Sequence, residues 1–176
     1  MRILDTSRYI NEKLDIKPIS KSRLGEFLKC TEFPKTKDEL RETIEERMKK
    51  YGNNCNLNDI DVSEITDMSW LFSINLGLSR FSGNISRWNT SNVKNMSHMF
   101  YWAKDFNCDI SKWDVSNVYN MESMFEHAES FNQDLSNWNT KNVGFRIFDG
   151  GYRKIFYSCP LKSQPEKQPI FKDANT

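Results

Sequence analysis

A chain of 176 residues that is 38% hydrophobic and 28% charged can bury one continuous core but hardly two, which favours a single folding unit. The net charge is +1, but the central part of the chain is acidic, because residues 51–150 carry 7 basic and 12 acidic side chains. This balance argues against a duplex nucleic-acid groove, where clustered Lys and Arg neutralise phosphates. No stretch approaches the roughly 18 consecutive apolar residues of a membrane span.

The N-terminal segment, residues 1–20, predicts a cytoplasmic location. Charged residues run through it, so it lacks the apolar stretch of a secretory signal. The cysteines at positions 30, 55, 108 and 159 show no paired spacing and are expected to stay as thiols in an intracellular protein. A cell-surface location stays open if the chain is part of a longer protein.

Residues 1–52 are predicted to form an N-terminal helical cap. A short helix is expected from Lys21 to Cys30. A stronger pattern begins after Thr36, because Thr36 and Glu39 form a capping box, and it ends at Gly52. Its apolar stripe consists of Leu40, Ile44 and Met48. We expect this stripe to cover the first repeat, whose core would otherwise be open.

Residues 53–156 are predicted to hold three to four copies of a unit of about 25 residues. Trp88, Trp113 and Trp138 stand 25 residues apart. The sequence around them recurs as FSGNISRWNTSNVKNMSHMF, FNCDISKWDVSNVYNMESMF and FNQDLSNWNTKNV. An earlier copy places Ile60 in the tryptophan column and carries three extra residues within SINLGLSR, which we expect to form a loop. Such recurrence predicts stacked coils whose matching apolar residues form one core.

Within each unit, the pattern favours one short helix and one short strand. From Asn120 to Ser130, apolar side chains recur at helical spacing, with Asn120 as the expected N-cap. The stretch DISKWDV is expected to be a strand that pairs in parallel with the next coil. Repeating Ser and Asn columns are expected to bridge unpaired backbone groups. These columns are Ser86, Ser111 and Ser136, and Asn92, Asn117 and Asn142.

The C-terminal part is predicted to lie outside the repeats. The last copy decays after Val143, as expected of a terminal coil on which nothing stacks. Residues 157–176 contain Pro160, Pro165 and Pro169 among polar residues, so we expect an extended tail.

The repeated phrase resembles the MSxMFxxAxxFNxDISxWDxSNV unit of the BspA-type leucine-rich-repeat family, and similarity extends over about residues 34–156. This resemblance implies an α/β fold, a short leucine-rich-repeat-like β/α solenoid. It also implies a protein that binds other macromolecules, frequently at a cell surface, and it supplies no catalytic residues.

No catalytic, cofactor-binding or metal-ligating residues are predicted. His98 and His127 hold non-equivalent repeat positions and are expected to be exposed helix residues, not ligands of one metal. Asp109 and Asp134 share a column, which indicates a ladder near a turn, not an acid–base pair. The sequence has no glycine-rich phosphate loop and no Gly-x-Ser-x-Gly motif. We therefore do not expect an enzyme.

The candidate partner-binding residues differ between copies and are thus released from the repeat. They are Trp70, Arg87, Lys94, His98, Tyr101, Trp102, Lys112 and Tyr119. Trp70, Tyr101 and Trp102 could form an apolar patch of the kind that anchors protein interfaces. Alternatively, they pack beneath SINLGLSR or the N-terminal helices; their solvent exposure distinguishes the two.

Three functions fit these patterns. The first is a non-enzymatic module that binds a partner protein through the solenoid surface. The second is an inhibitor encoded by a phage or mobile element that blocks a bacterial enzyme or defence complex. The third is a cell-surface, adhesin-like fragment. The sequence leaves the oligomeric state open.

Overall fold

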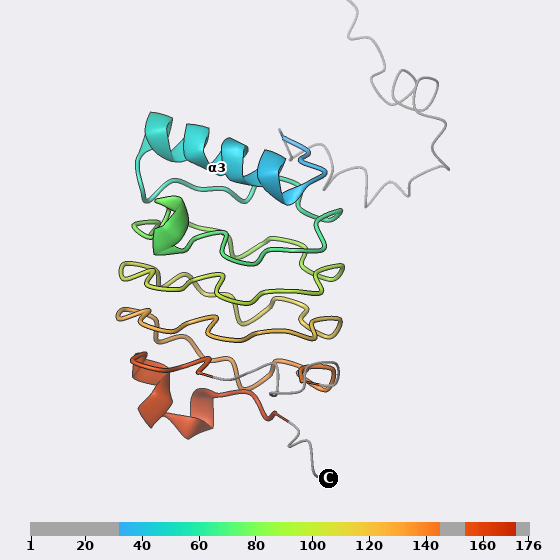
Figure 1. The fold of residues 1–176 in the computed structure, drawn as a ribbon, viewed down its shortest axis with the longest axis vertical. Helices are drawn as coiled ribbons and strands as arrows, with labels where there is room; N and C mark the ends of the chain where they lie inside the picture. Colours follow the sequence, from blue (N-terminus) through green and yellow to red (C-terminus); the bar gives the residue numbers. More distant parts are fainter. Residues whose placement is uncertain (1–31, 145–153, 172–176) are drawn as a thin grey trace, which may run out of the picture.

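The computed structural model describes residues 32–144 and 154–171, and it forms a stack of flat coils (Figure 1). One α-helix lies across one end of the stack, and two 3-10 helices lie at the other end. The helix predicted from Lys21 to Cys30 lies outside the described residues. The core runs through the centre of the stack, from the end helix to the last coil.

The end helix is α3, Lys37–Tyr51, and its boundaries follow from its capping residues. Thr36 has an extended backbone, and its side chain accepts a hydrogen bond from the amide of Glu39. The Glu39 carboxylate accepts from the amide of Lys35 at 2.6 Å. Gly52 ends the helix with φ 86°, a conformation that glycine adopts without steric cost. The helix predicted after Thr36 is therefore confirmed.

Helix α3 is attached to the first coil by an apolar face and by flanking ion pairs. Leu40, Ile44 and Met48 are buried in the core, so the predicted cover of the first repeat is confirmed for the described residues. Lys37 on α3 pairs with Asp67 at 3.1 Å. The remaining pairs join Lys35 to Glu64 and Arg47 to both Glu32 and Asp59. These charges place the helix in one orientation on the apolar surface.

Each coil forms one layer, and we name the layers by their residue in the tryptophan column. The layers are those of Ile60 (first), Trp88 (second), Trp113 (third) and Trp138 (fourth). Backbone amides of alternate residues donate to the following layer. From the second layer, the amides of Met96, His98, Phe100 and Trp102 donate to the carbonyls of Asn120, Glu122, Met124 and Glu126. The amides between them close tight turns within their own layer, as Met99 does to the carbonyl of Met96.

The predicted leucine-rich-repeat-like β/α solenoid is wrong. Over residues 32–144 and 154–171 there is one α-helix, three short 3-10 helices and no sheet. Despite the backbone hydrogen bonds between layers, strand-type pairing in these ranges is limited to four isolated parallel bridges. The bridges are Glu32–Ile60, Asn56–Asn84, Asp67–Asn95 and Asn95–Asn120. The coils do stack in parallel, but their extended stretches are too short to form strands.

Neither element predicted within a unit forms. The segment from Asn120 to Ser130 is a run of turns, because Ser123 and His127 adopt the left-handed conformation with φ 52° and 58°. In an α-helix each amide after the first turn donates to the carbonyl four residues earlier, whereas the amides of Phe125 and His127 donate to the next layer. The DISKWDV stretch also turns, since the Asp109 carboxylate accepts from the amide of Ser111.

The core consists of aromatic columns that run across the layers. Phe72, Phe100, Phe125 and Phe156 form one column, with neighbouring ring centroids 5.5, 5.5 and 5.8 Å apart. Phe81, Phe106 and Phe131 form another. The columns also touch each other, since the rings of Phe100 and Phe106 lie 3.9 Å apart and nearly parallel. The predicted apolar columns are therefore confirmed as one core.

The tryptophans occupy equivalent places and link the layers by hydrogen bonds. The indoles of Trp88 and Trp113 stack with centroids 6.2 Å apart. Each indole N–H donates to a carbonyl of the preceding layer, at 2.9 Å for Trp88, 3.1 Å for Trp113 and 3.2 Å for Trp138. The acceptors are Leu57, Ile85 and Ile110. A buried polar N–H is thereby satisfied at each level.

The predicted asparagine ladder is confirmed. The side-chain amides of Asn92, Asn117 and Asn142 donate to carbonyls of the preceding layer at 2.7, 2.7 and 2.6 Å. The acceptors are Ser63, Ser91 and Ser116. The serine column acts differently, because the backbone amides of Ser86, Ser111 and Ser136 donate to the side-chain oxygens of Asn84, Asp109 and Asp134.

The segment SINLGLSR forms the predicted loop. It contains the 3-10 helix η1, Ile74–Leu76, which ends at Gly77 in the left-handed conformation. The Ile74 side chain is 50% exposed. Its backbone amide nevertheless donates to the carbonyl of Tyr101, so the insertion leaves the layer bonds intact.

The last copy does not decay after Val143 as predicted, because the turn pattern returns at Lys154. Lys154 and Ser158 adopt the left-handed conformation that His98 and Trp102 adopt in the second layer. The amides of Phe125 and His127 donate to the carbonyls of Ile155 and Tyr157. The offset to the third layer is 31 residues, from Ser123 to Lys154, in place of 25, and this change concealed the copy.

The C-terminal segment stacks beneath the fourth layer, so the prediction of an extended tail is wrong for residues 157–171. It contains η2, Pro160–Ser163, and η3, Pro165–Lys167. Proline favours the first turn of a helix, which explains both starts. The amide of Leu135 donates to the carbonyl of Lys167, and Thr140 donates to the carbonyl of Ile170. These contacts cover the last coil.

The tryptophan column gives a stability test. We expect Trp113→Ala to lower the free energy of unfolding by about 3–5 kcal/mol, because it leaves a cavity between two layers. Trp113→Phe keeps a ring and loses the hydrogen bond to Ile85, so its cost should be nearer 1 kcal/mol. Urea denaturation measures both. Equal losses for the two variants would contradict this account of the column.

Candidate protein-binding surface

The left-handed residues of successive layers form two columns at one edge of the stack. The first column contains Trp70, His98, Ser123 and Lys154, and the second contains Trp102, His127 and Ser158. Non-glycine residues adopt this conformation at a cost of roughly 1–2 kcal/mol, least for Asn, Asp and His. A bulky tryptophan is therefore unusual here, and such outliers cluster at functional sites.

The upper part of this edge holds three rings in mutual contact. The rings of Trp70 and His98 stack with centroids 3.9 Å apart and planes 7° apart. The Tyr101 ring meets both edge to face, with centroids at 5.6 Å. This stack joins the first layer to the second.

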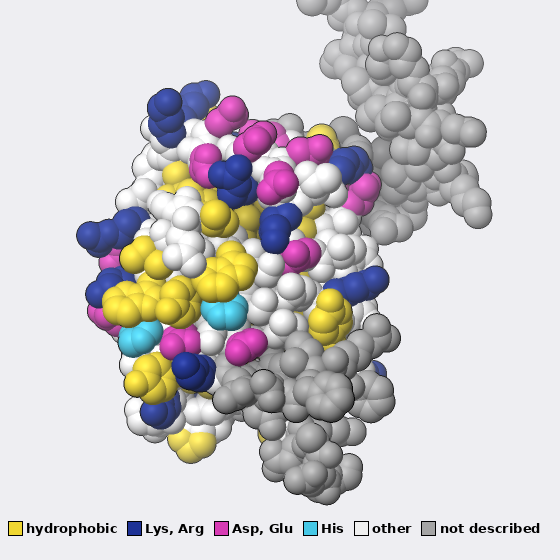
Figure 2. All heavy atoms as spheres, in the orientation of Figure 1, with side chains coloured by type: hydrophobic (Ala, Val, Ile, Leu, Met, Phe, Trp, Pro, Cys, Tyr) yellow, Lys and Arg dark blue, Asp and Glu magenta, His cyan; other side chains and the backbone are white. Residues whose placement is uncertain are grey.

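A second set of rings continues the edge downward. Trp102 stacks on His127 with centroids 4.2 Å apart, and Tyr157 meets His127 edge to face at 5.5 Å. The ammonium groups of Lys104 and Lys162 lie over the rings of Trp102 and Tyr157, each at 5.1 Å. We call the six rings, Trp70, His98, Tyr101, Trp102, His127 and Tyr157, the aromatic ridge. Figure 2 shows apolar and histidine side chains gathered on the left of the view.

The ridge is a surface feature, not a part of the core. Five of its rings are half-buried, and Tyr157 is 46% exposed. The core phenylalanines beside them, such as Phe100 and Phe125, are 0% exposed. Trp70, Tyr101 and Trp102 thus bury part of their area against other ridge side chains while remaining accessible.

A shallow pocket of about 240 Å³ adjoins the lower end of the ridge. Its lining residues are Lys154, Ile155, Phe156, Tyr157, Lys162 and Gln168. Tyr157 thus belongs to both the pocket and the ridge, and the two lysines place positive charge at its rim.

His98 has an enclosed polar atom within the ridge. Its Nδ1 atom is buried and has no hydrogen-bond partner. Burial lowers the pKa of His98 below its ordinary value, although the carboxylates of Glu122 and Glu126 act in the opposite direction. Neutral imidazole is therefore the favoured form within the stack. His98 and His127 both lie in turns, so the prediction of helix residues is wrong.

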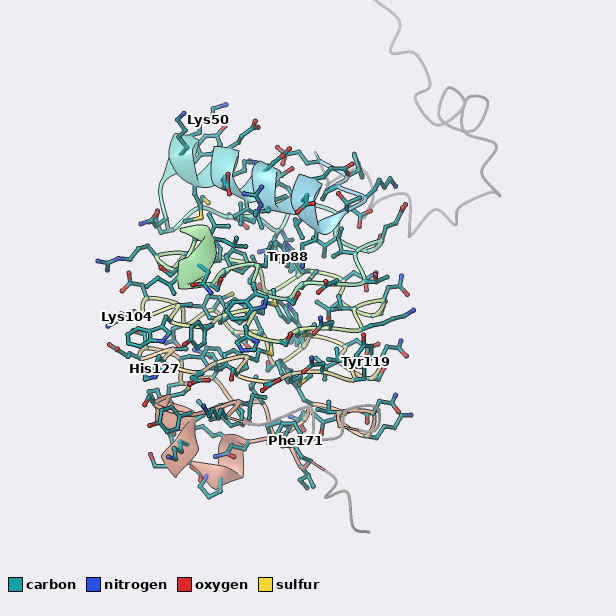
Figure 3. The ribbon with its side chains drawn as sticks, viewed as in Figure 1. Lys50, Trp88, Lys104, Tyr119, His127 and Phe171 are labelled. Carbon is teal, nitrogen blue, oxygen red and sulfur yellow. The ribbon has the colours of Figure 1, made fainter. Side chains whose placement is uncertain are left out.

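The other four candidate residues do not belong to the ridge. Arg87, Lys94 and Lys112 are exposed, and Tyr119 is half-buried. The amide of Tyr119 donates to the carbonyl of Lys94, so these two occupy the same turn in neighbouring layers. Figure 3 places Tyr119 at the opposite edge from His127 and Lys104.

Sequence reasoning missed two rings and two cations of this surface. His127 holds the repeat position of Trp102 one layer later, and equal repeat positions in neighbouring layers lie against each other. Tyr157 and Lys162 fall after the break in the repeat. The sequence carries a usable signal for Lys104, because it is two residues from Trp102. In the structure Lys104 pairs with Glu129 at 2.9 Å.

The carboxylates predicted to form a ladder lie at turns. A hydrogen bond from the backbone of Ser111 holds the pKa of Asp109 below its usual value, and Ser136 does the same for Asp134. Within residues 32–144 and 154–171, no three His, Cys, Asp or Glu side chains are grouped as a metal site would require. In the same ranges Cys55, Cys108 and Cys159 are free thiols.

Backbone strain at the ridge gives a second stability test. We expect Trp102→Asn to change the free energy of unfolding by less than about 1 kcal/mol, because Asn relieves the left-handed strain while ring stacking of about 0.5–1.5 kcal/mol is lost. Thermal and urea denaturation measure the change. A loss above about 2 kcal/mol would show that the ring contributes to folding as a core residue does.

No helix in the described part of the chain is long and apolar enough to cross a bilayer. Comparison with curated proteins and comparison with solved structures each found no match. A family model does match residues 39–150, which include most of α3 and the repeats that follow it. Its description is "Mycoplasma protein of unknown function, DUF285". Because this match covers more than half of the chain, the protein belongs to the DUF285 family.

Proposed function

We propose that this protein is a non-enzymatic interaction module that binds a partner protein through the aromatic ridge. The observation that carries the proposal is a pair of accessible ring sets at one edge, Trp70 with His98 and Tyr101, and Trp102 with His127 and Tyr157. The two sets are adjacent because Tyr101 and Trp102 are neighbours in the chain. Trp and Tyr are enriched among the residues that dominate binding energy in protein interfaces. Their packing against one another keeps them ordered before a partner arrives, which lowers the entropic cost of binding.

The strained tryptophans support the same proposal. Trp70 and Trp102 occupy left-handed positions, which Asn or Gly would hold at lower cost. Neither indole belongs to the buried core. A surface side chain that costs stability and fills no core space is best explained by a role in binding.

Two finer assignments belong with this proposal. The recurring MSxMF and DISxWD phrases support placing the protein among BspA-type repeat proteins within its family. The cytoplasmic location expected from residues 1–20 stays a prediction, as do the inhibitor and adhesin roles. The partner recovered by affinity capture from bacterial lysate distinguishes the inhibitor role from the adhesin role. An inhibitor should recover one enzyme in stoichiometric amount, whereas an adhesin should recover envelope or matrix proteins.

A residue exchange between layers tests the ridge. We expect the double variant Tyr101→Glu, Trp102→His, which installs the residues of the third layer at those positions, to stay folded and to lose most of its captured partner. The measurement is affinity capture from bacterial lysate with quantitative mass spectrometry, together with a thermal melt of each variant.

The matched control lies outside the ridge. Arg87→Asn with Lys112→Asn installs the residue of the fourth layer, Asn137, at two exposed positions. This variant should capture as much partner as the unaltered protein. Equal capture by the ridge variant and the unaltered protein, with both folded, would refute binding through the ridge.

A further inference from the structure

Both histidines of the 176-residue chain lie in the aromatic ridge. Each stacks beneath a tryptophan that holds the same repeat position one layer earlier: His98 beneath Trp70, and His127 beneath Trp102. The chain therefore contains two Trp–His stacks of the same design. The two stacks differ in the surroundings of the histidine nitrogens, and therefore in the cost of protonating each imidazole.

His98 has no acceptor for a second N–H. Its ring is covered by the face of Trp70 and by Tyr101, and Nδ1 is buried without a partner. Protonation would place a positive N–H in this enclosed position, and an unsatisfied buried charge is costly. For His127, no buried nitrogen without a partner is found. This second stack serves as an internal reference.

The charged and titratable groups around His98 oppose one another. Glu122 and Glu126, on the following layer, attract an imidazolium. The face of Trp70 also attracts a cation, and the ring of Tyr101 meets the imidazole edge to face. On the other side, Lys37 of helix α3 donates to the hydroxyl of Ser69, next to Trp70. Its positive charge is partly offset by its ion pair with the carboxylate of Asp67. Burial outweighs these attractions, in keeping with the lowered pKa of His98.

We propose that the Trp70–His98 stack is an acid-sensitive latch on the ridge: protonated His98 leaves the stack for water, and the indole of Trp70 becomes exposed. A rotation of the side chain brings both ring nitrogens to solvent without disturbing the backbone bond from His98 to Glu122. Only the effect of this opening on partner binding rests on the proposed function. Opening of the stack itself needs no partner.

The direction of the pH effect follows from linkage. The pKa of His98 is lower in the closed stack than its ordinary value of about 6.5, so the open state binds the proton more tightly. The closed stack is therefore favoured above about pH 6.5 and loses stability as the pH falls below that value. Once His98 is protonated in both states, further acid has no additional effect through this group.

The test measures the accessibility of single tryptophans. Hydroxyl-radical footprinting with mass spectrometry on the whole chain should show Trp70 oxidised several-fold faster at about pH 5 than at about pH 7.5. The rate at Trp113, which is 4% exposed, should stay constant and thereby report that the fold is intact. Nitrogen NMR of the imidazoles should show His98 becoming protonated over the same pH range.

Three variants separate the latch from general acid effects. His98→Phe keeps a ring against Trp70 and should keep Trp70 protected at both pH values. His98→Asn suits the left-handed backbone and removes the ring, so Trp70 should be oxidised rapidly at both. His127→Asn should retain the full pH response of Trp70. A pH response that persists in His98→Phe, or constant oxidation of Trp70 in the unaltered protein, would overturn the proposal.

Failure of the latch and failure of the proposed function are distinguishable. If Trp70 is oxidised at a constant rate and the Tyr101→Glu, Trp102→His variant loses capture, the latch is refuted and the binding surface is supported. A pH-dependent oxidation of Trp70, together with unchanged capture by that variant, would keep the latch and remove the proposed role of the ridge.

Discussion

The alternation of backbone hydrogen bonds is the constraint on which the rest of this structure depends. In the first three layers one amide closes a turn to the carbonyl three residues earlier, and the next donates to the following layer, as Met99 and Phe100 do. Both sets of bonds satisfy polar groups that a buried coil would otherwise leave unpaired. The alternation holds successive layers in register, so each side chain meets its equivalent one layer away. Aromatic columns such as that of Phe100 and Phe125 follow directly from this register.

The same constraint creates the surface. Turns of this kind need left-handed residues at fixed points, and Trp70, His98, Trp102 and His127 occupy them. Because register places equal positions against each other, a tryptophan in one layer stacks on whatever ring the next layer supplies. Two different side chains at the same repeat position therefore contact each other across neighbouring layers. The ridge thus joins rings from separate layers into one surface, although no single repeat unit contains it.

The two ends of the stack are closed by different means. At the first layer, helix α3 brings an apolar stripe together with Lys37 and Arg47, whose carboxylate partners lie on the coil or beside it. At the fourth layer, the chain coils once more, and Thr140 donates to Ile170 as Thr90 donates to Asp114 higher in the stack. Both devices cover core and unpaired backbone groups that an open end would expose. The ridge therefore lies on the side of a stack that is covered at top and bottom.

The sequence by itself determined the period, the core columns, the asparagine ladder and helix α3, because each depends on local spacing or on recurrence that can be read directly. It also singled out Trp70, His98, Tyr101 and Trp102, since large side chains at non-repeating positions stand out between copies. Only the tertiary structure decided that Asn120 to Ser130 and DISKWDV form turns, because bonds between layers outweigh the helical and strand patterns of an isolated unit. It also decided that His127 and Tyr157 complete the ridge. The register between layers decides which side chains touch. Because the last offset is 31 residues, a repeat of 25 residues does not reveal that Tyr157 belongs to the same column system.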